Sequence, residues 1–433
     1  MNILFLLADD LRWNSLGSMG NKIVHTPNID NLAQNGIRFT NACVTTSISM
    51  VSRASILTGQ YMSRHGISQF GVPVSEEAFA LTYPSILRKA GYWSGFVGKY
   101  GVGTIRDKDF DFSREYERVH WFPLGKGDSI HVTRRNLRDA LEFLNERPKD
   151  KPFVLSVSFF ATHAQDNHPD QYRYQPESEK YYSDVSIPVP ETASDKWFNS
   201  LPWFLATDEN EGRIRWHWRF DTPGKYQKYM KAYFRMLTEL DVAVGDIIAE
   251  LKRQGVYDNT LIIFTGDNGY FHGEHGLADK WYPYEESVRV PMIIHDPRLR
   301  LKGRPVVNGR FVLNIDIAPT IIAAAGLPVP AAMQGKDIAG LYLKRKPVKW
   351  REEFYYEHPF ITNEKRIPSS EAVITHEDKY IFWPYYKYEE YFNLEKDPYE
   401  KQNAANDPGN AVRIQILKDK LGKLREEAGN SLR

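Results

Sequence analysis

Five short runs of apolar residues constrain the fold of this chain more than any other feature of its sequence. Each run is bounded by polar or glycine-rich residues, and within it hydrophobic side chains follow one another almost without interruption. This pattern is typical of strands that are buried on both faces, as in parallel sheets. We predict strands at Ile3–Ala8, Trp93–Val97, Phe153–Phe160, Thr260–Thr265 and Pro291–His295.

Helical patterns lie between these strands. Thr26–Gly36 and Pro84–Gly91 each begin beside a proline and end at a glycine, which are common start and stop signals. His131–Glu146 is amphipathic, Lys225–Gly255 is predicted as one long helix or a broken pair, and Asp316–Gly326 as a short apolar helix. Strands that alternate with helices predict an α/β fold with a large, mostly parallel sheet flanked by helices.

The C-terminal part of the chain has a different pattern of apolar and aromatic residues. Val373–Trp383 and Glu389–Leu394 are short, aromatic-rich and partly alternating, which favours an antiparallel sheet. Ala411–Ala428 is then predicted as a charged helix. We therefore divide the chain into an α/β domain over residues 1–344 and a small α+β subdomain over residues 345–433.

The composition excludes several classes of protein. The chain has 56 Lys and Arg against 55 Asp and Glu, and its net charge of +1 gives no field to attract nucleic acid. One cysteine excludes an internal disulfide and a cysteine-based zinc site. No apolar run approaches the ~18 residues of a membrane-spanning helix, and no signal peptide precedes the first predicted strand. We expect no nucleic-acid partner and no transmembrane segment.

Polar side chains follow four of the predicted strands, where ligands bind in open parallel sheets. They are Asp9 and Asp10, Lys99, His163, and Asp267 with Asn268. Each pair alone is commonly a helix cap or a turn. Together, three carboxylates and an amide oxygen without a thiolate indicate a site for Ca²⁺ or Mg²⁺.

Two further segments carry candidate residues. Thr45–Gly59 brings small hydroxyl residues to the start of a helix that contains Arg53, which suits an anion site or a structural ion pair. His272–Arg289 carries His272, His275 and Lys280 near the same sheet edge. Lysines are mostly solvated, and loop histidines often only donate hydrogen bonds, so these residues alone assign no function.

At this point the sequence resembles the formylglycine-dependent sulfatases of the alkaline phosphatase superfamily. Seven segments carry the match, in the same order as in the family. The most specific is Ser49–Gly59. It lies where the family has its signature, which reads Cys or Ser, any residue, Pro or Ala, Ser, Arg and then Thr-Gly. The other segments are Asn2–Asp10, Thr26–Asn41, Gly91–Lys99, Thr265–Arg289, Asp316–Asp337 and Lys379–Pro408.

The resemblance implies a site residue by residue. Asp9, Asp10, Asp267, Asn268 and the residue at position 49 would hold one divalent cation, Ca²⁺ in most relatives and less commonly Mg²⁺. Ser49 would be oxidised to formylglycine by a formylglycine-generating or anaerobic sulfatase-maturing enzyme, and its hydrated form would attack sulfur. Arg53 would hold the diol. Lys99, His163 and Lys280 would neutralise sulfate oxygens, and His163 or Lys280 would donate a proton to the leaving oxygen.

The sequence departs from the family pattern at three positions. Ser49 stands where most relatives have cysteine, either as a natural, convertible serine or as a Cys-to-Ser change that leaves the protein nearly inactive. Val51 replaces the usual Pro or Ala, which bears on recognition by a maturase. Gly101 replaces a histidine that contacts the diol in relatives, and His131 or Tyr100 are the candidates to take its role.

The segment Asp166–Trp218 bears on the substrate. It interleaves aromatic residues with Arg213, Arg215 and Arg219, and flat rings beside cations suit a sulfated sugar. The alternative is that these aromatics only pack an irregular insertion. Because relatives in the resembled family are exported, we expect an exported protein that acts on a sulfated poly- or oligosaccharide. The predicted substrate-binding residues are His131, Arg213, Arg215, His217 and His275.

Two other functions stay open at this stage. A phosphodiesterase or phosphonate monoester hydrolase shares the expected fold, although a phosphate monoester carries about two negative charges and its hydrolases typically need a second metal. The sequence shows no second acidic cluster, but His272 and His275 remain candidate ligands for a second metal ion. A non-catalytic glycan-binding protein is motivated by Ser49, Val51 and Gly101.

Overall fold

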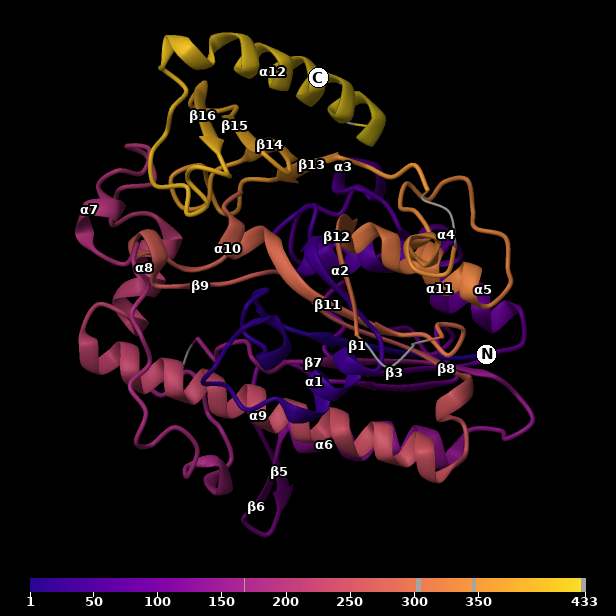
Figure 1. Cartoon of the computed structure of the whole chain (residues 1–433). Helices are drawn as coiled ribbons and strands as arrows, with labels where there is room; N and C mark the ends of the chain where they lie inside the picture. The colour runs from indigo at the N-terminus through magenta and orange to yellow at the C-terminus, as the bar shows by residue number, and fades with distance from the viewer. Residues whose placement is uncertain (167, 301–304, 345–347, 430–433) are drawn as a thin grey trace.

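The computed structural model describes residues 1–166, 168–300, 305–344 and 348–429, and it is built around one eight-stranded sheet (Figure 1). The strand order is β12-β2-β11-β8-β1-β7-β3-β4. All five predicted strands belong to this sheet, and β2, β4 and β12 were not predicted. The bounds are β1 Asn2–Ala8, β2 Ile37–Cys43, β3 Trp93–Gly98, β4 Phe112–Glu115, β7 Phe153–Phe159, β8 Thr260–Gly266, β11 Arg289–His295 and β12 Val306–Leu313.

The sheet is parallel around its centre and mixed toward one side. Strand β1 pairs in parallel with both β7 and β8, and β3 pairs in parallel with β7 and β4. Strand β11 runs antiparallel to β8 and to β2. The mostly parallel sheet is thereby confirmed, and the carboxyl ends of β1, β3, β7 and β8 meet at one edge.

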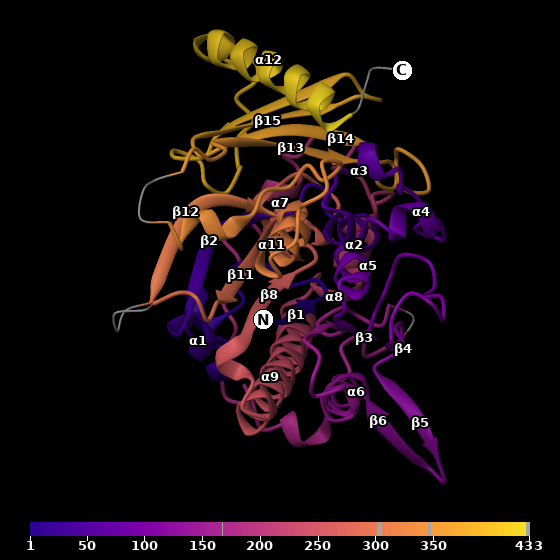
Figure 2. The ribbon, with the colours of Figure 1, turned by 90° about the vertical axis from the view of Figure 1, so that its right-hand side faces the viewer.

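Helices cover both faces of the sheet (Figure 2). Ile3, Phe5 and Leu7 of β1 pack in the core below α2, α5 and α11, whereas Leu4 and Leu6 pack in the opposite core below α1, α6 and α9. Burying each such side chain contributes about 1.5–3 kcal/mol, which explains the uninterrupted apolar run. The bounds are α1 Pro27–Gln34, α2 Ser49–Thr58, α5 Tyr83–Lys89, α6 Val132–Glu146, α9 Pro223–Arg253 and α11 Ile317–Ala324.

The predicted long helix is one continuous element, because α9 runs unbroken over 31 residues. The irregular segment between β7 and α9 holds only short helices, which leaves much of its chain in loops beside the sheet edge. The shorter elements are α3 Met62–His65, α4 Glu76–Phe79, α7 Asp195–Phe198, α8 Glu211–Arg219, α10 Glu285–Val288, and the two-stranded pairs β5 Trp121–Gly125 with β6 Asp128–His131 and β9 Phe271–His272 with β10 Ala278–Asp279.

The C-terminal part forms the predicted antiparallel sheet with a helix on its outer face, seen in yellow in Figure 1. Tyr355, Val373 and Tyr380 pack against α12, while the opposite face joins the core of the large sheet. The division of the chain at residue 345 falls outside the described residues and stays a prediction. The bounds are β13 Glu353–His358, β14 Ser370–Thr375, β15 Asp378–Trp383, β16 Tyr388–Asn393 and α12 Ala411–Ala428. Among the described residues, no helix is long and apolar enough to cross a membrane.

Candidate active site at the sheet edge

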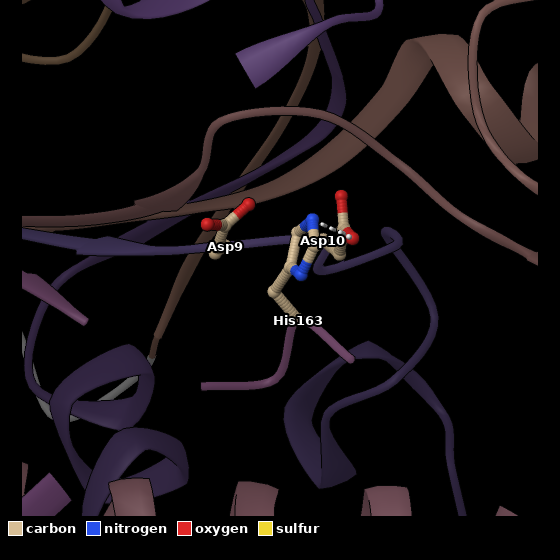
Figure 3. Close-up of side chains that lie close together, drawn as sticks. All are labelled: Asp9, Asp10 and His163. Carbon is tan, nitrogen blue, oxygen red and sulfur yellow. Dashed lines mark ion pairs between the residues drawn. The ribbon is translucent and has the colours of Figure 1, made fainter. Parts of the chain in front are cut away.

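The ends of four neighbouring strands bring polar side chains of distant sequence positions together. Asp9 and Asp10 follow β1, and His163 follows β7 at the same edge (Figure 3). One carboxylate oxygen each of Asp9 and Asp10 and one His163 nitrogen lie within 4.8 Å of one another. We call the group that gathers here the edge cluster, and its members are Asp9, Asp10, Ser49, Arg53, Lys99, His163, Asp267, Asn268 and Lys280.

The turn after β1 is held in a sparsely populated conformation. Asp10 has a φ of 52°, which is uncommon for a residue with a Cβ. Its carbonyl accepts a hydrogen bond from the Tyr233 hydroxyl at 2.8 Å, and its N–H donates to Asp267 Oδ1 at 3.2 Å. The Thr162 hydroxyl donates to the carbonyl of Asp9 at 3.1 Å. These bonds keep two adjacent carboxylates at the same sheet edge.

Ser49 begins helix α2 and lies among the cluster oxygens. Its Oγ is 3.0 Å from Asp9 Oδ1 and 3.2 Å from Asn268 Oδ1, and its side chain is buried. The first N–H groups of a helix have no partner within the helix, so its N-terminus favours negative charge. A nucleophile at position 49 would therefore sit between metal-ligating oxygens and a positive helix end.

Arg53 lies one helical turn further and ties three segments together. Its Nε donates to Asp267 Oδ2 at 2.8 Å, and its Nη1 donates to the Lys99 carbonyl at 2.6 Å and to the Ser158 hydroxyl. Gly101 has a φ of +71°, and a Cβ at that position would lie 2.9 Å from Arg53 Cδ. A histidine at Gly101 would therefore require the Arg53 side chain to move.

Three basic side chains face the carboxylates. Lys99 Nζ pairs with Asp9 Oδ2, Lys280 Nζ lies 2.5 Å from Asp10 Oδ1, and His163 Nε2 lies 3.6 Å from Asp10 Oδ2. Burial by itself raises the pKa of Asp9, but Lys99, His163 and Arg53 outweigh it and hold that pKa well below its usual range. Burial opposes the charged form of Lys280, yet Asp10 and Asp9 raise its pKa above the usual value.

The residues present fit a hard divalent cation. All the converging protein oxygens come from carboxylates and an amide, and the cluster contains no thiolate, which suits Ca²⁺ or Mg²⁺. Burial, and then the Asp9 charge, raise the pKa of Asp267, as expected for a buried carboxylate that lies beside a second one. Asn268 Nδ2 donates to Asp10 Oδ1 at 2.7 Å, so the amide oxygen points toward Ser49.

The structure does not bring His131 to the edge cluster. Its Nε2 lies 2.9 Å from the Arg173 carbonyl and its Nδ1 accepts from the Thr133 N–H, so both ring nitrogens are used at the start of α6. Burial lowers its pKa to about 4. Tyr100, the other candidate for the missing histidine, packs edge-on against Phe96 in the core.

The other predicted substrate-binding residues pack against rings or pair with carboxylates of the chain itself. The Arg213 guanidinium lies between the rings of Phe198 and Trp216, 3.9 and 3.8 Å from their centroids, in a cation–π arrangement. His275 is buried against Tyr284, and burial lowers its pKa to about 4. Arg215 pairs with Asp166 and Glu211 at 2.5 and 2.7 Å, and the partly exposed His217 lies 3.2 Å from Asp208.

Several residues that position the cluster were not identified from the sequence. Ser158 interrupts the apolar run of β7 and supports Arg53, and Thr162 and Tyr233 hold the Asp9–Asp10 turn. Polar residues within a strand otherwise made of large apolar side chains were the one available signal for Ser158. Tyr233 lies on α9, far away in the sequence, where a tyrosine on a helix gives no such signal.

Comparison with known proteins places the chain in a family. The sulfatase family model matches residues 1–327, and the model for the C-terminal part of N-sulphoglucosamine sulphohydrolase matches residues 273–427. The chain therefore belongs to the sulfatase family and is a sulfuric ester hydrolase.

Relatives and solved structures agree with this placement. An arylsulfatase of Clostridium perfringens is 29% identical over 98% of this chain and 94% of its own. An N-acetylglucosamine-6-O-sulfatase of Bacteroides thetaiotaomicron is 26% identical, covering 93% of this chain and 82% of that protein. The fold is shared, with a TM-score of 0.83 and 24% identity over 99% of this chain and 98% of the other, by a protein solved with its substrate D-glucosamine-2-N,6-O-disulfate. It is shared too by the phosphonate monoester hydrolase of Agrobacterium radiobacter, with a TM-score of 0.80 and 21% identity over 99% and 96%.

Proposed function

We propose that this chain removes sulfate from carbohydrates, using a formylglycine formed at position 49 and one divalent cation, Ca²⁺ rather than Mg²⁺. The observation that carries the proposal is the position of Ser49 Oγ, in hydrogen-bonding distance of Asp9 and Asn268 and beside the cations of the edge cluster. The maturase that would form the formylglycine is the proposed protein partner.

The charge of the edge cluster supports a cation and an anion that bind together. Three carboxylates, Asp9, Asp10 and Asp267, are matched by Arg53, Lys99 and Lys280. A bound divalent cation would supply the charge that neutralises the carboxylates and acidifies the hydroxyl at position 49. Lys99 and Lys280 would then be free to pair with sulfate oxygens as charge shifts in the transition state.

The remaining residues would handle orientation and protons. Arg53 would keep the residue at position 49 aligned, since its guanidinium is fixed by Asp267 and the Lys99 carbonyl. The His163 side chain is 20% exposed, more than those of Lys280 and Lys99, so it is the most accessible of the three to a substrate. His163 or Lys280 would donate the proton to the leaving alcohol oxygen.

The carbohydrate assignment rests on relatives and on one surface feature. Besides the N-acetylglucosamine-6-O-sulfatase, the relatives include human N-sulphoglucosamine sulphohydrolase, 25% identical over 98% of this chain, and an extracellular sulfatase homolog of Drosophila melanogaster. Trp203 and Tyr385 are each 67% exposed, and Tyr386, stacked on Phe204 at 3.9 Å, holds both in place. Exposed flat rings suit the apolar faces of sugars. By analogy with the Drosophila relative, the proposed site of action is outside the cell.

The test is the mass of the peptide around residue 49 together with sulfate release. The Ser49 protein, Ser49→Cys and Ser49→Ala are each co-produced with a maturase and assayed on sulfated glycans, aryl sulfates and phosphonate monoesters. We expect formylglycine and sulfate release from glycans for the convertible forms and neither for Ser49→Ala. Conversion without release of sulfate from any ester would refute the proposal, and faster phosphonate cleavage would replace it with the phosphonate alternative.

A further inference from the structure

A buried network surrounds Arg219, the last residue of helix α8, outside the edge cluster. The Arg219 side chain is fully buried, and each guanidinium nitrogen has a partner. Nε donates to Gln171 Oε1 at 2.5 Å, and Nη1 donates to the Tyr270 hydroxyl at 2.9 Å. Nη1 also pairs with Asp279 Oδ1, and Nη2 pairs with Asp166 Oδ1. Removing this arginine would leave Asp166 and Asp279 with Arg215 as their remaining cationic partner.

The partners of Arg219 lie on three of the segments that carry edge-cluster residues. Asp166 follows His163 by three residues on the loop after β7. Tyr270 follows the metal-ligand candidate Asn268 by two residues on the loop after β8. Asp279 directly precedes Lys280 at the end of β10. One arginine from the irregular insertion therefore connects all three loops.

The connection to Lys280 is the most direct. Asp279 and Trp281, on either side of Lys280, have φ values of 68° and 86°, a conformation that residues with a Cβ rarely adopt. The Asp279 carboxylate accepts from the Tyr270 hydroxyl at 2.5 Å and from Arg219, which fixes one side of this bend. The Trp281 N–H donates to the Ser47 carbonyl at 3.2 Å, which fixes the other.

The charges of the network are balanced without the edge cluster. Arg219 and Arg215 face Asp166 and Asp279, with Arg215 Nε 3.8 Å from Asp279 Oδ2. The Tyr172 hydroxyl lies 2.7 Å from that of Tyr270 and extends the network into the core. Since these ion pairs satisfy one another, Lys280 keeps its ammonium for Asp10, 2.5 Å away.

We propose that Arg219, acting through Asp279 and Tyr270, is a positioning residue that aims Lys280, and with it His163, at the sulfate ester. The reaction named here rests on the proposed function. Arg219 itself touches neither substrate nor cation. Its effect is on geometry, and a displacement of about 1 Å in such a group costs on the order of 10²-fold in rate.

The test compares Arg219→Lys and Tyr270→Phe with the converted parent enzyme on aryl sulfates of graded leaving-group pKa. Arg219→Lys keeps the positive charge but removes the planar guanidinium that donates to several partners at once. Tyr270→Phe removes one hydroxyl and keeps the shape of the ring. We expect kcat to fall about 10²-fold for Arg219→Lys and less for Tyr270→Phe. The rate should also depend more steeply on leaving-group pKa, because the leaving oxygen receives its proton less readily.

Arg235→Lys is the matched control. Arg235 is also buried, but it binds the carbonyls of Tyr181 and Glu179 at 3.0 and 2.8 Å, away from the cluster loops. This control should keep the parental slope even if its melting temperature falls. A parental slope in both test variants, whatever their melting temperatures, would overturn the proposal and leave Arg219 a purely structural residue.

Crystal structures separate this proposal from the proposed function. They are determined for the unconverted Ser49 protein and for its Tyr270→Phe variant. We expect Lys280 Nζ to leave Asp10 Oδ1 in the variant, regardless of whether any sulfate ester is hydrolysed. An unmoved Lys280 contradicts the positioning role, whereas a moved Lys280 in a protein that cleaves no sulfate ester supports it and counts only against the proposed reaction.

Discussion

Two buried groups of charged residues differ in how their charge is compensated. In the edge cluster the carboxylates of Asp9, Asp10 and Asp267 meet an equal number of Lys and Arg side chains. The second group, which we call the carboxylate cluster, joins α10 to the C-terminal sheet around one lysine, Lys379, which pairs with Glu285 and Glu400 at 2.9 and 2.7 Å. Its acidic members are Glu285, Glu286, Glu390 and Glu400.

The pKa values follow this difference. Burial raises the pKa of Glu390 and Glu286 to about 8 and that of Glu400 to about 7, and neighbouring carboxylates act in the same direction. Glu390 accepts from the Trp383 indole at 2.8 Å and from the Tyr284 hydroxyl, as a structural carboxyl group should. In the edge cluster burial also raises the pKa of Asp267, whereas at Asp9 the nearby Lys99 and other basic groups outweigh burial and lower the pKa.

The largest effect is expected at position 49. Ser49→Ala, produced with a maturase, should lower kcat by at least about 10⁴-fold relative to the convertible protein, because no nucleophile remains. The mutated side chain is small, so the melting temperature should stay within a few degrees of the parent. Substantial residual turnover would show that the edge cluster is not organised around this residue.

Removing one cation should unbalance the edge cluster. Lys99→Met leaves Asp9 with less compensation, and we expect the metal-free protein to lose about 3–5 kcal/mol of unfolding free energy. Urea unfolding measures this loss, with Lys228→Met, which removes an exposed pair with Asp170, as the control. If both variants lose equally little unfolding free energy, the balance of charge in the edge cluster does not contribute to stability.

A divalent cation should substitute for the missing lysine. Ca²⁺ at 100 times its dissociation constant is expected to stabilise the parent by about 2.7 kcal/mol, and a chelator should reverse this. At the same Ca²⁺ concentration the gain should be greater in Lys99→Met, where Asp9 has lost one of its cationic partners, and should disappear in Asp10→Asn. Equal stabilisation of Asp10→Asn would place the ion elsewhere.

The carboxylate cluster should make stability depend on pH. The unfolded chain releases the Glu390 proton near the ordinary glutamate pKa, whereas the folded chain keeps it up to about pH 8. Over that interval the folded state binds more protons, so the free energy of unfolding falls as pH rises, by at most about 1.4 kcal/mol per unit for this group. Glu390→Gln should flatten the slope between pH 5 and 8, and Glu142→Gln, on the surface beside Arg114, should not.

The strand ends were predictable because their signal is local. An uninterrupted apolar run followed by Asp9 and Asp10, or by Asp267 and Asn268, contains both the buried strand and the polar edge. The strands β2 and β12 carry polar residues among their apolar ones, since they lie toward the side of the sheet where burial is incomplete. Their pattern is therefore weaker, and they were missed.

The fate of the aromatic and basic residues of the insertion was not predictable. Arg213 and His275 are residue types common on sugar-binding surfaces, yet they are buried, whereas Trp203 is exposed and packs against Tyr386 from a distant hairpin. Arg219 is adjacent to Trp218 in sequence but is fully enclosed by residues of three other loops. Side-chain burial depends on which distant segments pack together, and local periodicity does not contain that information.

The α/β fold could be inferred from the amino-acid sequence, as could the sulfatase resemblance and the residues that follow each buried strand, because apolar runs and the residues beside them are local properties. The pairing of those residues emerges only in the folded chain, as do the burial of several predicted substrate-binding residues and the connection that Arg219 makes between the loops around Lys280. The physical reason is that charge compensation and burial are set by neighbours in space, which for this chain come from segments far apart in sequence.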